Sequence, residues 1–226
     1  MKVYVLTCDK YSHLLPGFAW LFNKYWSATQ EVTVLGFGPI PRLPQNFSFK
    51  SLAPAETLPW TDHMLKYFSS CGDDRFVLLL DDYWLTKAVD LDRVNLMHMH
   101  VGAGAAKGDL SANTYVQGAE PYGEEDDLWI ANQDARYRSS TQPCIWSQDY
   151  LIRLLVRGRH IWDFERLGAR DAKNDGAKII GPQHAIYDYA NIYKKGEFVA
   201  STYNKITKAD RLELKQAGYL NFIEEN

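Results

Sequence analysis

This sequence of 226 residues has few cysteines, a small net charge and no long apolar run. The three cysteines, Cys8, Cys71 and Cys144, are odd in number, far apart and without C-x-x-C spacing, which argues against a disulfide framework and a structural zinc site. No apolar run approaches the roughly 20 residues that span a bilayer, and the N-terminal apolar segment is too short for a signal sequence. We therefore expect a cytoplasmic protein without a transmembrane segment.

The charges nearly balance, with a formal net charge of −3. This balance gives no general electrostatic reason to expect binding to nucleic acid or to an anionic membrane, so any phosphate recognition must be local. Hydrophobic residues make up 46% of the chain, enough to bury the core of one compact domain. Aromatic residues are abundant at 14%, which is compatible with a surface that stacks on ring-shaped ligands, although aromatics also fill cores.

Strand-like and helix-like segments alternate through the first hundred residues. Residues 2–7 and 31–37 have the pattern of buried strands, and the segment from Pro16 has helical apolar spacing. The unbroken apolar run at 75–80 predicts a strand buried on both faces. This alternation predicts an α/β fold: a Rossmann-like, three-layer α/β/α sandwich with a mostly parallel central sheet.

The second half of the chain is less regular. One or two added strands are expected between residues 128 and 146, and the acidic run 124–127 is expected to be a solvated loop. Helices are predicted at 147–158, from 161 onward and at 207–220, and a hairpin is predicted around "YKKGE". No repeat, linker or low-complexity tract is present.

The stretch "RFVLLLDDYW" places two adjacent carboxylates, Asp81 and Asp82, directly after the buried strand. Parallel sheets bind ligands at the carboxyl ends of their strands. Neighbouring strand residues point to opposite faces, so both carboxylates reach one ligand only if the chain turns at Asp81. In that case the pair suits a hard cation such as Mg²⁺ or Mn²⁺, which neutralises a diphosphate. Alternatively, Asp82 binds backbone amides of the turn and Asp81 is solvated.

Several blocks together resemble the GT-A-fold glycosyltransferases of bacteria and phages, which use nucleotide sugars. These blocks span residues 1–166 and are "VYVLTCDKY", "LLPGFAWLFNKYW", "LPWTDHM", "VLLLDDYWL", "STQPCIWSQDYLIRLL" and "IWDFE". The resemblance implies one GT-A-like domain over 1–226, with a nucleotide-binding half, 1–105, and an acceptor-side half with a C-terminal helix, 106–226. Many such enzymes separate the two aspartates by one residue. Here Tyr83 takes the third position, which leaves open the metal dependence.

The resemblance also assigns roles to residues near the strand ends. Thr7, Cys8 and Asp9 would hold the nucleoside, Asp62 would help to place a phosphate or the sugar, and Tyr83 and Trp84 would line the sugar site. Asp81 and Asp82 would bind the metal and the diphosphate. Turn formation alone would explain Asp9, and helix capping alone would explain Asp62.

The segment "IWDFE" supplies a second acidic site, Asp163 and Glu165. In a helix these side chains diverge by about 200°, so at most one faces the cleft. By the resemblance Glu165 matches the general base, which takes a proton from the acceptor hydroxyl. Both residues could instead be ordinary surface charges. Cations for a leaving diphosphate could come from a larger set: Arg153, Arg157, Arg159, Arg166, Arg170, Lys194 and Lys195.

The sequence thus predicts an enzyme: a glycosyltransferase, of the kind used in polysaccharide biosynthesis, that moves a sugar from a nucleotide-sugar donor to a glycan or other hydroxyl acceptor with a divalent cation. The resemblance also implies that His184 could complete the metal site, although a lone histidine is more often a packed or surface residue. Two alternatives stay open. One is a non-catalytic member of the fold that binds a carbohydrate or a protein, and the other is a metal-dependent nucleotidyltransferase.

Overall fold

A nine-stranded sheet forms the centre of the computed structural model, which describes residues 1–112, 119–123 and 127–224. Its strand order is β3-β2-β1-β4-β9-β6-β10-β8-β7, and only β8 and β9 of these run against the others. The predicted mostly parallel sheet is therefore confirmed. The bounds are β1 Val3–Leu6, β2 Val32–Gly36, β3 Phe47–Ser51, β4 Arg75–Leu80, β6 Lys107–Asp109, β7 Ala119–Pro121, β8 Leu128–Ala131, β9 Cys144–Ser147 and β10 Ile179–Pro182.

Both faces of the central strands are buried, which explains their unbroken apolar sequences. Val3 and Val5 of β1 belong to one hydrophobic core, whereas Tyr4 and Leu6 belong to a second core on the other face. Since strand side chains alternate between the faces, every residue of β1 needs to be apolar or aromatic. The two cores make the molecule a three-layer sandwich, as predicted.

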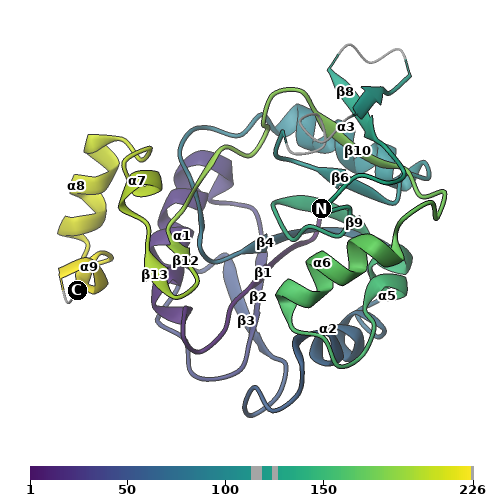
Figure 1. Ribbon diagram of the computed structural model, residues 1–226. Helices are drawn as coiled ribbons and strands as arrows, with labels where there is room; N and C mark the ends of the chain where they lie inside the picture. The colour runs from purple at the N-terminus through teal and green to yellow at the C-terminus, as the bar shows by residue number, and fades with distance from the viewer. Residues whose placement is uncertain (113–118, 124–126, 225–226) are drawn as a thin grey trace.

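Helices cover both faces of the sheet (Figure 1). On one side lie α2 (Trp60–Phe68), α5 (Gln148–Leu154) and α6 (Ile161–Asp171), which contact one another. The other core includes α3 (Leu91–Gly102) and α1 (Leu15–Phe22), with the 3₁₀ turn η1 (Ser12–Leu14) before α1 and the π-helical turn η2 (Asn23–Ser27) after it. No helix within the described residues combines the length and apolar character needed to cross a bilayer.

The C-terminal third adds short elements beside α1. Strand β5 (Tyr83–Leu85) pairs with β11 (Tyr189–Asn191), and β12 (Tyr193–Lys194) forms a hairpin with β13 (Glu197–Phe198). Helices α7 (Ala200–Tyr203), α8 (Lys208–Gln216) and α9 (Asn221–Glu224) follow, on the α1 side of the molecule in Figure 1. The predicted hairpin and the predicted C-terminal helix are confirmed, and the Thr207 hydroxyl caps α8 by accepting from the Asp210 amide.

Several predicted boundaries differ from the structure. Helix α5 ends at Leu154, four residues before Gly158, rather than running to that glycine. Helix α2 begins at Trp60 after Pro59, so neither Thr61 nor Asp62 caps it. Of the predicted acidic loop at 124–127, residues 124–126 lie outside the described residues, and Asp127 forms an ion pair with Arg93 of α3.

Candidate active site

The chain bends directly after β4, which is required if Asp81 and Asp82 are to reach the same ligand. Strand β4 ends at Leu80, Asp81 and Asp82 form a turn, and β5 begins at Tyr83. The Asp81 amide donates to the carbonyl of Leu6 at 3.2 Å, which ties the turn to the end of β1. Both aspartates consequently line one cavity of about 540 Å³ at the carboxyl ends of β1 and β4.

Trp84 holds this bend from inside the protein and does not line the cavity, contrary to the prediction. It is fully buried, and its indole Nε1 donates to the Asp81 carbonyl at 3.1 Å. Its ring lies against Gly17 of α1, where an added Cβ would be only 2.2 Å from a ring carbon. The alternation along β5 explains the difference, because Tyr83 and Trp84 point to opposite faces. Tyr83, 8% exposed, does line the cavity.

The two aspartates have different surroundings. The Thr7 hydroxyl donates to Oδ2 of Asp81 at 2.5 Å, whereas Oδ1 of Asp82 is buried and has no hydrogen-bond partner among the described residues. Burial raises the pKa of Asp81 well above its ordinary value, and the charge of Asp82 adds to the shift. Burial also raises the pKa of Asp82 to about 7, with a further contribution from Glu165. The cavity therefore brings several acidic groups together, and no described residue donates a hydrogen bond to Oδ1 of Asp82.

Glu165 of α6 lines the same cavity. The backbone amide and the hydroxyl of Thr141 both donate to its Oε1, at 2.7 and 2.6 Å, and no residue that the structure describes donates to Oε2. One carboxylate oxygen is thereby held in place while the other can accept a proton. Asp163 does not line the cavity and instead pairs with Arg166 at 3.0 Å. As the helical spacing predicts, only one of these two acidic residues faces the cleft.

The predicted nucleoside residues divide into two groups. Thr7 and Cys8 line the cavity, and burial, together with the charge of Asp81, raises the pKa of Cys8 to about 11. Asp9 lies outside the cavity lining, where its carboxylate accepts from the Gly38 amide at 2.8 Å. The Asp9 side chain thus links the segment after β1 to the loop after β2, a long-range contact that the sequence did not predict.

Asp62 also lies outside the cavity lining. Its carboxylate accepts from the amide of Gly158 at 2.7 Å and faces Arg157 at 3.5 Å, so it fastens the connection between α5 and α6. Thr61 reinforces this contact, because its hydroxyl bonds both the amide and the carbonyl of Arg159. The helix-capping explanation is wrong for Asp62, because Pro59 occupies the N-cap position of α2. Two other residues of α2, Trp60 and Met64, line the cavity instead.

Two of the predicted cations reach the cavity, Lys194 and Lys195 of the β12–β13 hairpin. Four of the candidate arginines pair with carboxylates elsewhere: Arg153 with Asp175, Arg157 with Asp62, Arg159 with Asp171 and Arg166 with Asp163. The hairpin therefore brings positive charge to the cavity that the acidic residues line. The sequence placed these lysines at a hairpin tip but could not choose between them and the arginines.

Sequence reasoning missed Asn191 and Thr141. Asn191 ends β11, pairs with Tyr83, lines the cavity and has a buried Oδ1 without a partner among the described residues. Both positions depend on contacts between segments far apart in the chain, for which the sequence carries no local signal. His184, by contrast, is exposed and does not line the cavity. Among the described residues no cluster of three or more His, Cys, Asp or Glu side chains could hold a metal ion.

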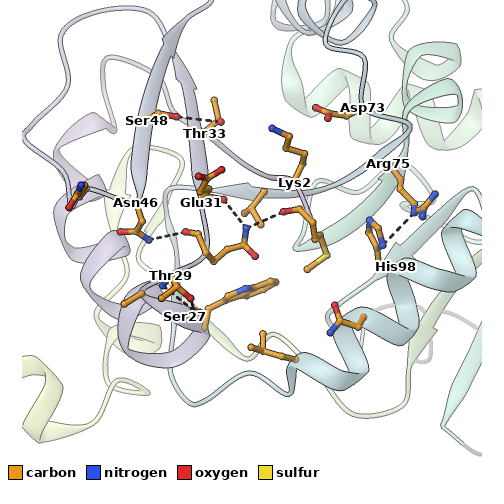
Figure 2. Close-up of a pocket in the computed structure, with 18 of the residues that line it drawn as sticks. Lys2, Ser27, Thr29, Glu31, Thr33, Asn46, Ser48, Asp73, Arg75 and His98 are labelled. Atoms are coloured by element: carbon orange, nitrogen blue, oxygen red, sulfur yellow. Dashed lines mark hydrogen bonds between the residues drawn. The ribbon is translucent and has the colours of Figure 1, made fainter.

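A larger groove, about 1320 Å³, lies at the opposite ends of β1, β2 and β4 (Figure 2). Its polar side chains mostly bond to one another or to nearby backbone. Figure 2 shows Arg75 donating to His98, and Asn46 to the carbonyl of Gln30. None of its polar atoms is buried without a partner among the described residues. The smaller cavity, lined by Asp81, Asp82 and Glu165, is therefore the candidate functional site.

No family model matches this sequence, and no curated protein matches it. Solved structures match at the level of the fold. UDP-glucose pyrophosphorylase from Acinetobacter baumannii matches over 100% of both chains with 11% identity and a TM-score of 0.55. A UDP-glucose pyrophosphorylase complexed with UDP-glucose matches over 96% of this chain and 100% of that one, with 10% identity and a TM-score of 0.50. TarS of S. aureus matches over 87% of this chain and 38% of its own length, with 14% identity and a TM-score of 0.51. These likenesses confirm the predicted fold class, a GT-A-like α/β sandwich.

Proposed function

We propose that this protein is a glycosyltransferase that moves a sugar from a nucleotide-sugar donor to a hydroxyl group of an acceptor. One observation carries the proposal: Asp81 and Asp82, at the bend after β4, line the same cavity as Glu165 of α6. Had these acidic groups been on opposite sides of the molecule, this chemistry would have been excluded. The structural neighbours support the use of a nucleotide sugar, since two of them are UDP-glucose pyrophosphorylases and one of these is complexed with UDP-glucose.

The donor end of the cavity suits a nucleoside diphosphate and a hard divalent cation such as Mn²⁺ or Mg²⁺. Asp82 and Asn191 each present a buried oxygen without a partner among the described residues, and Asp81 lies beside them. Carboxylate and amide oxygens are preferred ligands of such cations, which often take only one or two protein carboxylates and complete their shell with phosphate oxygens. When bound, the cation would neutralise charge on the diphosphate leaving group. Thr7 and Cys8 would contact the nucleoside.

The acceptor end supplies a base. Oε2 of Glu165 would take the proton of the acceptor hydroxyl as that oxygen attacks the anomeric carbon. The bond from that carbon to the diphosphate breaks, and its electron pair leaves with the diphosphate. Thr141 holds Oε1 throughout and so fixes the direction of Oε2. Lys194 and Lys195 would receive the negative charge that develops on the leaving group.

Nucleotidyl transfer is the second candidate, favoured by the full-length match to a pyrophosphorylase fold. That reaction attacks a phosphorus atom of a nucleoside triphosphate, whose phosphates are commonly cradled by backbone amides of a glycine-rich loop. The connection between β1 and α1, residues 7–14, contains no glycine. Product analysis separates the candidates: glycosyl transfer releases a nucleoside diphosphate, whereas nucleotidyl transfer releases pyrophosphate.

Calorimetric titration with UDP, GDP, ADP, CDP and dTDP tests the donor site. With Mn²⁺ present, we expect one of these nucleotides to bind, and chelation of the Mn²⁺ with EDTA should weaken binding. Asp82→Asn removes the negative charge of one candidate ligand, and Asn191→Leu removes the oxygen of another, both at nearly constant volume. Each should lower the affinity at least about tenfold, or about 1.4 kcal/mol.

Asp163→Asn is the matched control, because it removes a carboxylate from α6 that lies outside the cavity lining. Its affinity for the nucleotide should equal that of the wild type. The proposal is wrong if no nucleotide of the panel binds, or if Asp82→Asn binds as tightly as Asp163→Asn.

A further inference from the structure

Two large aromatic side chains stand exposed at the mouth of the cavity. Tyr137 is 53% exposed and Trp162 is 63% exposed, and both line the cavity that contains Glu165. Single exposed apolar residues are ordinary, but a pair of exposed aromatic faces at one cavity mouth indicates an interaction surface. Aromatic rings offer a large apolar face at little entropic cost and pack well against other rings.

The backbone of Tyr137 is strained. Its φ is 59°, a left-handed conformation that costs a non-glycine residue free energy and persists only where the surroundings impose it. The next residue imposes it here: the Arg138 guanidinium is fully buried and donates to the carbonyls of Asn132, Ala172 and Ala177. The strain therefore keeps the Tyr137 ring at the surface while Arg138 anchors the segment in the interior.

The same segment is fixed to the helix that carries Glu165. The Ser139 hydroxyl contacts the carbonyls of Phe164 and Glu165, at 3.0 and 2.9 Å, and Thr141 holds the Glu165 side chain. The approach is close, since a Cβ on Gly168 would lie 2.8 Å from the Ser139 hydroxyl. Tyr137 is thus placed relative to Glu165 by a rigid contact.

Trp162 is placed by the helix itself. It precedes Glu165 by three residues, and residues at this spacing are neighbours on one helix surface. Its ring is not used for packing, as its high exposure shows, whereas Phe164 on the buried face fills the core. Two exposed aromatic rings, carried on a helix and on a segment bonded to that helix, therefore line the same cavity as the Glu165 carboxylate.

We propose that Tyr137 and Trp162 form the acceptor subsite and that the acceptor is a neutral saccharide. This inference rests on the proposed function and specifies its acceptor. A pyranose ring has an apolar C–H face that stacks on an aromatic ring and hydroxyl groups at its edge, one of which would reach Oε2 of Glu165. An anionic acceptor would be repelled by the carboxylates of Glu165 and Asp82. An acyl chain would need a continuous apolar groove, whereas Glu165 and Thr141 also line this cavity.

Saturation-transfer NMR with methyl pyranosides of glucose, galactose, mannose and N-acetylglucosamine tests the subsite without requiring activity. We expect the wild type to transfer saturation to the ring protons of at least one glycoside. Trp162→Ala and Tyr137→Gly should each weaken that glycoside's binding at least about fivefold, and Trp162→Phe should retain most of it. Phe49→Ala on β3, which removes an aromatic side chain that is 37% exposed and is not among the lining residues, is the control.

Tyr137 is replaced by glycine because glycine adopts positive φ freely, so the change should not destabilise the fold. This variant should melt at the wild-type temperature or above while losing the glycoside. The inference is overturned if no glycoside binds, or if binding survives both aromatic replacements. Mn²⁺-dependent nucleotide binding is measured on the same variants: if it persists while no glycoside binds, the acceptor assignment alone fails, and if it is absent in the wild type, the proposed function fails.

Discussion

At the residue scale, the adjacent carboxylates after β4 serve two purposes. The Asp81 carboxylate accepts a hydrogen bond from the Thr7 hydroxyl, and the Asp81 amide donates to the Leu6 carbonyl of β1. Asp81 therefore has a largely structural role. Asp82 has a buried oxygen without a partner among the described residues and faces the cavity. An unpaired buried charge is costly, so a ligand that supplies positive charge would be bound strongly. Both carboxylates can therefore stand at one strand end, because Asp81 is stabilised by the protein itself and only Asp82 depends on a ligand.

Glu165→Gln tests the base directly. The amide cannot accept the acceptor proton, so we expect kcat for release of the nucleoside diphosphate to fall about 10²- to 10⁴-fold while donor affinity changes little. Asp163→Asn, two residues earlier on α6, should keep wild-type turnover since its carboxylate lies outside the cavity lining. Equal losses in the two variants, or full turnover in Glu165→Gln, would contradict the assignment. Turnover is measured with the donor identified by calorimetry.

Local pattern was enough to place Asp81 and Asp82 at a strand end and to predict that at most one of Asp163 and Glu165 faces the cleft, whereas the choice of Glu165 came from the family resemblance. Local pattern failed for Trp84, because the bend decides which residues of β5 point to the cavity and which point to the core, and Trp84 points to the core. It also failed for Asn191, which reaches the cavity only because β11 pairs with β5, about a hundred residues earlier in the chain. Side chains placed by long-range pairing leave no local signature in the sequence.

At the scale of elements, features set by local sequence were likewise predicted, and features set by long-range pairing were not. Strand β4 was predicted with its observed bounds, since a continuous apolar run between polar residues defines both ends. The order of the strands in the sheet was not predicted, because β9 inserts between β4 and β6 by contacts that only the folded chain makes. The short pair β5 and β11 was missed for the same reason.

The β12–β13 hairpin is the element that we expect to close on the diphosphate. Its turn residues, Lys195 and Gly196, both have positive φ, 55° and 87°, and both hairpin lysines line the cavity. Lys195→Gly removes one charge and relieves the backbone, so stability should not fall. We expect nucleoside diphosphate binding to weaken about three- to tenfold, and this loss should shrink as NaCl is raised because salt screens the lost charge.

Lys50→Ala, on β3, serves as the control for that variant, because Lys50 is exposed and does not line the cavity. Its calorimetric affinity for the nucleoside diphosphate should match the wild type at every salt concentration. A Lys195→Gly variant that binds as tightly as Lys50→Ala at low salt would show that the hairpin does not contact the diphosphate.

At the scale of the whole molecule, the cavity exists only when both halves of the chain are assembled. Thr7, Asp81 and Asp82 come from the first half, whereas Glu165, Asn191 and the hairpin lysines come from the second. The hairpin itself is followed by α7, α8 and α9, which lie beside α1 (Figure 1). The position of the lysines thus depends on how firmly the C-terminal helices attach to the N-terminal ones.

That attachment centres on Asp210 of α8, which is 1% exposed. Its carboxylate accepts from Lys24 and Tyr25 of η2, both at 2.6 Å, and from the Thr207 hydroxyl at 2.7 Å. Burial alone would raise the pKa of Asp210, but the hydrogen bonds from Lys24, Tyr25 and Thr207 outweigh it and lower the pKa. A carboxyl whose pKa is lowered by folding stabilises the folded state above its unfolded pKa, about 3.9, and this contribution is lost as the pH falls through the folded value.

Asp210→Asn should therefore reduce the free energy of unfolding by about 2 kcal/mol at pH 7, because hydrogen bonds to a charged group contribute more than neutral ones. Urea titrations at pH 7 and pH 3 measure the difference, which should narrow at the lower pH as the wild-type carboxyl approaches its protonated form. Glu213→Gln is the control, since that carboxylate is half exposed and lies 3.7 Å from Lys24, and it should change stability by less than about 0.5 kcal/mol. An Asp210→Asn variant that lost no more stability than Glu213→Gln at pH 7 would contradict this prediction. The docking of α8 would then depend on apolar packing through Leu214, and protonation of Asp210 at low pH would not displace the hairpin.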